Sequence, residues 1–167
     1  MCEVPSRLTY MSQNAAQTGE TWILDESSAD LRMNLELSVV ALYTVSQWAM
    51  PKLLQVADDK IYKPALIVTS GWLANAPEPN YFALGVCKSA QQNIVHSLND
   101  QLRSRGVHCG LVMVDDTVTR EAWNTNPTNI AEECWKLYDS QGNGNMELET
   151  HIREDGGKGQ PTGRTGT

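Results

Sequence analysis

Three polar side chains in this sequence of 167 residues could take part in chemistry together: the hydroxyl of Ser70, the amine of Lys88 and the amide of Asn34. A hydroxyl and an amide can bond a substrate oxygen, and a nearby amine favours the ionised form of an acid. Taken singly, each has a structural explanation. Ser70 ends an apolar run, where its hydroxyl could bond the next loop, while Lys88 and Asn34 could face water on helices. Only their joint arrangement can therefore indicate a site.

A metal centre is not expected. The cysteines at positions 2, 87, 109 and 134 are far apart, and none has a second cysteine or a histidine at the spacing that metal ligands need. We interpret them as reduced thiols that pack as small apolar groups.

The charge excludes two classes of partner. The formal net charge is −7, and the lysines and arginines are scattered, so neither nucleic acid nor an anionic membrane is expected to bind. No apolar run approaches the roughly 20 residues that span a bilayer, and the first residues do not form a signal peptide. The sequence thus favours a soluble, cytoplasmic protein.

Apolar periodicity predicts the elements that would position the three side chains. Residues 28–56 follow a helical period, with Ser27 or Ser28 as the N-cap and a kink near Pro51. Residues 65–70 (ALIVTS) form a short continuous apolar run, which is typical of a strand that is buried on both faces of a parallel sheet. Residues 81–105 predict a second helix, which Gly106 ends.

The rest of the chain repeats this alternation. Residues 107–114 predict a strand, and residues 129–139 a helix that Thr128 or Asn126 caps. After a turn at 141–144, apolar and polar side chains alternate over residues 146–152, which predicts a last strand. Residues 1–24 and 153–167 lack a period and are expected to form a disordered leader and a disordered tail. The fold class is α/β, with a partial doubly wound (Rossmann-like) parallel sheet and flanking helices.

Several segments resemble, in their order and rough spacing, the short-chain dehydrogenase/reductase family. LRMNLEL (31–37) and WAMPKL (48–53) are similar to the family's fourth helix, and IVTSG (67–71) is similar to the strand end that carries its serine. YFALGVCKSAQQN (81–93) is similar to its Tyr-x-x-x-Lys helix. Residues 107–119 are similar to its sixth strand and cofactor loop, and residues 129–137 to a later helix. The resemblance identifies residues 25–152 as the C-terminal part of an NAD(P)-binding domain whose N-terminal half is missing.

The resemblance also implies roles. Ser70 would orient a substrate oxygen, Lys88 would hold the nicotinamide ribose, and Asn34 would position a relay water. Thr117 or Thr119 would contact the carboxamide of the cofactor NAD(P). The substrate would be a small carbonyl compound or alcohol, and the helices at 28–56 and 81–105 would form a homodimer interface.

Three departures from the family pattern count against activity. Leu84 stands where the family has its catalytic tyrosine, and leucine has no proton to exchange. Val114 and Asp115 replace the Pro-Gly that usually begins the cofactor loop. No glycine-rich phosphate turn precedes these elements, and the strand at 65–70 would be left with an open edge.

Tyr81 is the nearest phenol that could replace the missing tyrosine. It lies seven residues before Lys88, which places it on about the same helix face but roughly 10 Å away along the axis. Tyr81 could instead reach the site from the preceding loop, or simply pack against the prolines of that loop. Two hypotheses follow: an impaired NAD(P)-dependent oxidoreductase, and a non-catalytic protein that keeps the family's dimer interface.

Overall fold

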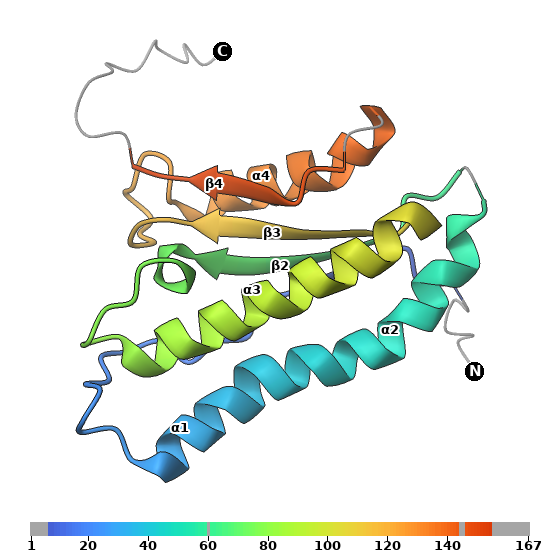
Figure 1. Ribbon diagram of the computed structural model, residues 1–167. Coiled ribbons are helices and arrows are strands. Elements are labelled where there is room, and N and C mark those ends of the chain that lie inside the picture. Colours follow the sequence, from blue (N-terminus) through green and yellow to red (C-terminus); the bar gives the residue numbers. More distant parts are fainter. Residues whose placement is uncertain (1–6, 60, 144–145, 155–167) are drawn as a thin grey trace, which may run out of the picture.

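The computed structural model describes residues 7–59, 61–143 and 146–154. Four strands form one parallel sheet in the order β1-β2-β3-β4: β1 (Tyr10–Gln13), β2 (Ala65–Gly71), β3 (His108–Val114) and β4 (Glu149–Ile152) (Figure 1). The predicted parallel α/β sheet is therefore confirmed. None of the described helices is long and apolar enough to cross a membrane.

Strand β1 corrects the prediction of a disordered leader over residues 1–24. It pairs with β2, with Ser12 opposite Ile67, so the edge of β2 that was expected to be open is covered. A strand of four residues has too few positions to show a period, and its pairing depends on the neighbouring strand rather than on its own side chains. Residues 1–6 of the predicted leader and 155–167 of the predicted tail lie outside the described residues.

The first predicted helix is present as a continuous run of three parts: α1 (Ser28–Leu35), a π-helical turn (Glu36–Val40) and α2 (Ala41–Ala57). Ser27 is its N-cap, and the Ser27 hydroxyl accepts a hydrogen bond from the backbone N–H of Asp30. The π-helical turn was not predicted. Because such a turn carries one extra residue, it shifts the helical face and is often found near a functional site.

The other two helices lie close to their predicted positions. Helix α3 (Phe82–Leu102) continues as a short 3₁₀ turn (Arg103–Arg105) and ends at Gly106, whose φ of 81° is in the left-handed region that glycine tolerates. Helix α4 (Pro127–Asp139) begins two residues earlier than predicted, because Asn126 caps it and Pro127 fits its first turn.

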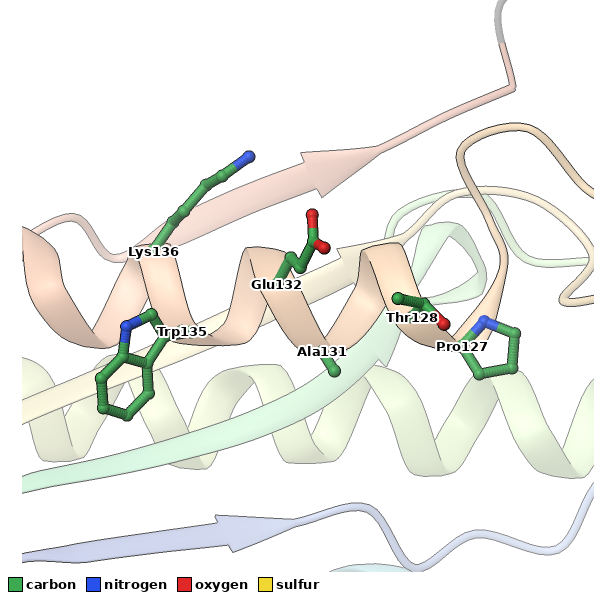
Figure 2. Close-up of a pocket in the computed structure, with 6 residues that line it drawn as sticks. All are labelled: Pro127, Thr128, Ala131, Glu132, Trp135 and Lys136. Carbon is green, nitrogen blue, oxygen red and sulfur yellow. The ribbon is translucent and has the colours of Figure 1, made fainter. Parts of the chain in front are cut away.

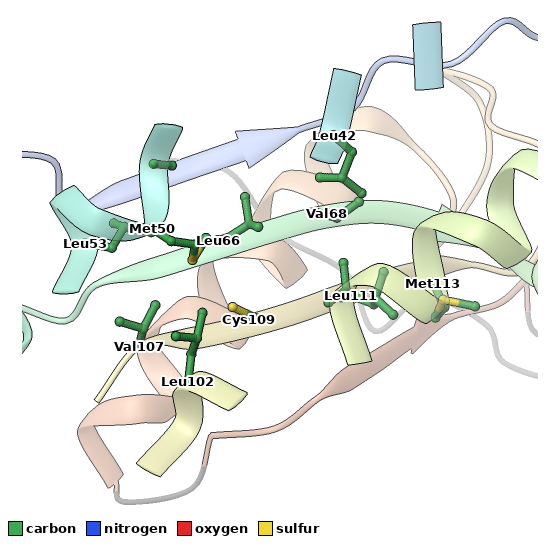
Figure 3. Packing of buried hydrophobic residues seen from close by; sticks show 12 residues of the cluster. Leu42, Met50, Leu53, Leu66, Val68, Leu102, Val107, Cys109, Leu111 and Met113 are labelled. Atoms are coloured by element: carbon green, nitrogen blue, oxygen red, sulfur yellow. The ribbon is translucent and has the colours of Figure 1, made fainter. Parts of the chain in front are cut away.

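The sheet is covered differently on its two faces. On one face, α2 and α3 bury a large apolar cluster that includes Leu53, Leu66 and Leu111 (Figure 3). On the other face, α4 packs Leu137 against residues such as Ile67 and Val112. Because α3 and α4 join successive strands but lie on opposite faces, the two crossovers have opposite hands. The crossover through α3 has the usual right hand, and the long loop 115–126 carries α4 to the other face.

His108, the first residue of β3, gives the core a dependence on pH. Its side chain is fully buried, and Nε2 lies 2.6 Å from the carbonyl oxygen of Glu147. Burial lowers the pKa of His108 below its usual value. The unfolded chain therefore binds more protons once the pH falls below about 6.5, and the folded state loses stability there.

We predict that the free energy of unfolding of the wild type falls between pH 6.5 and pH 5. His108→Leu should be less stable at pH 7, because the bond to Glu147 is lost, but its stability should change less over this interval. Urea unfolding at several pH values measures both effects. Equal slopes for the two proteins would show that His108 does not cause the acid sensitivity.

Candidate active site

Lys88 lies on α3 and reaches the carboxyl end of β2. Its Nζ donates a hydrogen bond of 2.9 Å to the carbonyl oxygen of Thr69, and the residue is only 9% exposed. Burial lowers the pKa of Lys88 from 10.5 to about 8. A lysine amine on a helix is normally exposed to water, but the Lys88 amine lies inside the protein.

Ser70 follows Thr69 on the same strand end and is also buried. Its Oγ has no hydrogen-bond partner in the described part of the chain. A buried hydroxyl without a partner is unfavourable by itself, and Ser70 shares this state with Gln91 Oε1, Asn99 Oδ1 and His108 Nδ1 among the described residues. In doubly wound sheets ligands bind at the carboxyl ends of the strands, and that is the end where Ser70 and Lys88 lie.

Asn34 lies in the last turn of α1 and is 3% exposed. Its amide Nδ2 donates to the Glu26 carboxylate at 3.3 Å, so the side chain is held by the loop before α1. Among the described hydrogen bonds, none joins Asn34 directly to Ser70 or Lys88. The π-helical turn begins two residues after Asn34.

Tyr81 is the N-cap of α3, and its backbone N–H donates to the carbonyl of Glu78 at 3.1 Å. It is seven residues from Lys88, which corresponds to roughly 10 Å along the helix axis. Leu84, one turn before Lys88, is partly buried and offers no polar atom. The position that faces Lys88 across one helical turn thus has no side-chain acid.

The loop after β3 places the two candidate threonines at the surface. The Thr119 hydroxyl accepts from the backbone of Ala122 at 3.0 Å, and the Thr117 carbonyl accepts from the Thr125 hydroxyl at 2.9 Å. The Thr117 side chain has no hydrogen bond within the described residues, whereas Thr119 already uses its oxygen to hold the loop.

Asp115, the residue after β3, is bonded to the last strand and the residue that follows it. Its Oδ2 is 2.7 Å from Nδ1 of His151 and 2.9 Å from Nε of Arg153, and its side chain is only 5% exposed. Both partners belong to β4 or the residue after it. The carboxylate that departs from the family's loop pattern is therefore bonded within the protein.

Sequence reasoning missed a second layer of polar residues beneath Lys88. Gln91, on the same face one turn later, is fully buried and donates to the carbonyl of Ser38 at 3.1 Å, inside the π-helical turn. Its Nε2 is also 3.5 Å from Oε1 of Gln13, at the end of β1. Gln91 is three residues after Lys88, and this helical spacing is the sequence signal that could have placed both on one face of α3. Gln13 lies in β1, which the sequence did not predict as a strand.

Glu154 was also missed, because the sequence placed it in a disordered tail. Its carboxylate accepts hydrogen bonds from the backbone N–H groups of Trp123, Asn124 and Thr125 at 2.6–3.2 Å. These bonds, above all that from Thr125, hold the pKa of Glu154 below its usual range. Glu154 therefore fixes the loop that leads into α4.

The described residues fit one end of a nicotinamide dinucleotide. A buried amine and an unpartnered hydroxyl suit ribose and substrate oxygens at the strand ends. The diphosphate needs backbone N–H groups at a tight turn between a strand and a helix. The described residues contain no glycine-rich turn of this kind, since β1 is followed by the long loop 14–27. The described residues also hold no cluster of three His, Cys, Asp or Glu that could bind a metal ion.

No protein-family model and no curated protein matches this sequence. Solved structures do match it. A short-chain dehydrogenase from Rhodopseudomonas palustris has a TM-score of 0.72 and 16% identity, over 86% of this chain and 61% of that chain. The bulky-bulky ketone specific alcohol dehydrogenase from Comamonas testosteroni has a TM-score of 0.71 and 14% identity, over 87% of this chain and 55% of that one.

A third match is a short chain oxidoreductase from Pseudomonas aeruginosa PAO1 that contains an atypical catalytic center. Its apo structure has a TM-score of 0.72 and 17% identity, over 92% of this chain and 67% of that chain. The chain therefore has the fold of the short-chain dehydrogenases/reductases. It spans about three fifths of the length of the first of these structures.

Proposed function

We propose that this chain is an oxidoreductase of the short-chain dehydrogenase/reductase type, which interconverts a small carbonyl compound and its alcohol with NAD(P) and is impaired by its missing tyrosine. The observation that carries the proposal is the buried Lys88 amine, which is bonded to the Thr69 carbonyl, the residue before Ser70, whose hydroxyl has no partner among the described residues. Burying an amine that titrates near 8 costs the fold about 3 kcal/mol at pH 7. An apolar side chain would serve packing better, so a binding role explains this lysine.

Each residue has a defined task in this proposal. Ser70 would donate a hydrogen bond to the substrate oxygen without losing its proton, and Lys88 would bond the ribose hydroxyls. Asn34 orients a water molecule near the π-helical turn. A bound nicotinamide would supply or accept the hydride. The proton comes from a water that occupies the space beside Leu84, or from the Tyr81 phenol if the loop before α3 moves.

The Pseudomonas oxidoreductase has a similar fold and an atypical catalytic center, so it supports the proposal that a chain of this fold can act without the usual catalytic site. A short chain oxidoreductase from the same organism, which also contains an atypical catalytic center, has been solved with NADPH bound, and it matches 80% of this chain at a TM-score of 0.59. A changed catalytic centre is thus compatible with NADPH binding in a protein of similar fold.

Titration of NADH and NADPH, followed by nicotinamide fluorescence, tests the proposal. We expect weak but saturable binding, because the described residues offer contacts to the nicotinamide end and none to the diphosphate. Lys88→Met should abolish the signal, whereas the control Lys52→Met, far along α2 and stacked on Trp48, should leave it unchanged. Absence of binding at millimolar cofactor would refute the oxidoreductase proposal for this chain.

A second candidate function is that of a non-catalytic homodimer, and the outer face of α1 and α2 favours it. Five large apolar side chains there are 43–56% exposed: Met33, Leu37, Val40, Tyr43 and Trp48. Exposed apolar side chains that lie together on one helix mark an interaction surface. The outward positions of α3 are polar, as at Ser89, Asn93 and Ser97, so the first helix would carry most of this interface.

Light scattering after size exclusion tests the dimer. Leu37→Lys should halve the mass, while Val118→Lys, at an equally exposed apolar residue of the loop after β3, should not. A mass that Leu37→Lys leaves unchanged would argue against this interface.

A further inference from the structure

Lys88 has few bonding partners for a buried lysine. Its Nζ donates a hydrogen bond to the carbonyl oxygen of Thr69 and takes part in no ion pair within the described part of the chain. An ammonium group has three hydrogens to donate, whereas a neutral amine has two and a lone pair. Because buried polar hydrogens are normally bonded, a single acceptor suits the neutral amine better than the ammonium. The lone pair of that amine is then free to react.

Two other lysines are bonded in the opposite way. Lys136 lines a groove on α4 together with Trp135, and its side chain extends away from the helix (Figure 2). Its Nζ lies 2.6 Å from a carboxylate oxygen of Glu133, and this hydrogen bond raises the pKa of Lys136. Nζ of Lys63 likewise lies 2.7 Å from the carboxylate of Asp139. A carboxylate partner favours the ammonium form, which has no lone pair to share.

We propose that Lys88 is a nucleophile that binds a small aldehyde or ketone covalently, as an imine. The lone pair of Nζ forms a bond to the carbonyl carbon, and the two hydrogens of the amine leave with the carbonyl oxygen as water. Ser70 follows Thr69 on β2, and its hydroxyl has no partner among the described residues. A hydrogen bond from this hydroxyl to the carbonyl oxygen would assist the attack. The step needs no oxidant, no reductant and no nicotinamide, so it goes beyond the proposed function.

Burial makes this amine reactive at neutral pH. It lowers the pKa of Lys88 to about 8, so about one molecule in ten carries the neutral amine at pH 7. A lysine with the usual pKa near 10.5 is neutral in only about one molecule in 3000 at this pH. Lys88 also keeps 9% of its surface exposed, so the side chain is not sealed from small molecules. A small carbonyl compound should therefore react with Lys88 in preference to lysines at the surface.

Reductive trapping with propanal and cyanoborohydride tests the imine in the absence of any cofactor. Mass spectrometry of peptides then locates the propyl groups. At pH 7, Lys88 should carry at least about ten times more label than Lys136, because its larger neutral fraction outweighs its poorer access. Labelling of Lys88 should level off above pH 8, whereas labelling of Lys136 should still rise about tenfold per pH unit.

Lys88→Arg is the matched variant. Arginine keeps a hydrogen-bond donor for Thr69 but is not a nucleophile, so the label at position 88 should disappear while Lys136 is labelled as before. Circular dichroism checks that the variant is folded. Wild-type protein that is labelled at Lys136 and not at Lys88 would overturn the proposal.

NADPH added before the aldehyde separates this inference from the proposed function, which places the nucleotide on the same amine. Protection of Lys88 from the label would support both. A label that NADPH does not reduce would support the imine and count against the cofactor role. Binding of NADPH to a protein that gives no label at Lys88 would overturn the imine and leave the proposed function intact.

Discussion

Replacing Lys88 by methionine is expected to make the protein more stable by about 2 kcal/mol at pH 7. The Lys88 residue is 9% exposed and burial lowers its pKa to about 8, which corresponds to a cost of about 3 kcal/mol for keeping the amine charged inside the fold. Loss of the hydrogen bond to Thr69 offsets about 1 kcal/mol of the gain. A mutation that removes the proposed function should thus stabilise the chain, as is common for groups kept for activity.

The gain from Lys88→Met should depend on pH in a defined direction. Between about pH 8 and 10.5 the unfolded chain holds the lysine proton and the folded chain does not, so the wild type gains stability as the pH rises. The advantage of the variant should therefore shrink over this range and be lost by pH 10.5. Burial also raises the pKa of Cys109 to about 12, which lowers the stability of both proteins above pH 9. The quantity to measure is therefore the difference in free energy of unfolding between the variant and the wild type.

Urea unfolding of both proteins at pH 7, 9 and 10.5 measures this difference. Lys52→Met is the matched control, because Lys52 is not deeply buried and its amine lies over the ring of Trp48. Its effect should be small at every pH. A Lys88→Met variant that is less stable than the wild type at pH 7 would mean that the lysine supports the fold, and the functional interpretation of its burial would be wrong.

Gly71→Ala is expected to destabilise the protein by about 3 kcal/mol. The φ of Gly71 is −174°, which any residue adopts, so backbone conformation is not the reason. Instead, a Cβ at this position would lie 2.7 Å from the carbonyl oxygen of Val114 on β3. Both groups belong to backbones that pair in the centre of the sheet, so neither moves without loss of hydrogen bonds. Ser70 and the carboxyl end of β3 would be displaced together.

Gly85→Ala is the matched control for Gly71→Ala. Gly85 lies within α3, and its added Cβ would meet the Leu73 carbonyl at 3.6 Å, an ordinary contact. Because alanine favours helix more than glycine does, this variant should be stabilised by up to about 1 kcal/mol. Thermal unfolding of both variants gives the comparison. Equal effects would show that the close approach at Gly71 is relieved by small shifts of the strands.

The fold was predictable from the sequence wherever a buried helix or strand has a recognisable pattern of apolar residues. The apolar run at 65–70 and the strand at 107–114 are buried on both faces, and Gly106 ends a helix with a positive φ. Strand β1 was not predictable, because its four residues are held by pairing with β2 and by contacts far along the chain. The bounds of α4 depended on choosing between two caps, and the structure uses Asn126.

The candidate site was only partly predictable. The order of Asn34, Ser70 and Lys88 along the chain carried the resemblance, but burial of Lys88 and the absence of a partner for Ser70 depend on packing between α3 and β2. The bonding of Asp115 to His151 joins residues 36 positions apart, which no local pattern reveals. The same holds for Gln91, whose partners lie on β1 and in the π-helical turn.

Lys88 is a buried amine, and we propose that it binds a nicotinamide nucleotide. A nuclear magnetic resonance titration of protein with ¹³C-labelled lysine side chains tests it most directly, with Lys88→Met to assign the signal. We predict that Lys88 titrates near 8, as burial requires, and that NADPH shifts its signal while the signal of Lys52 stays in place. A Lys88 that titrates at its ordinary value of about 10.5 and ignores the nucleotide would contradict the claim.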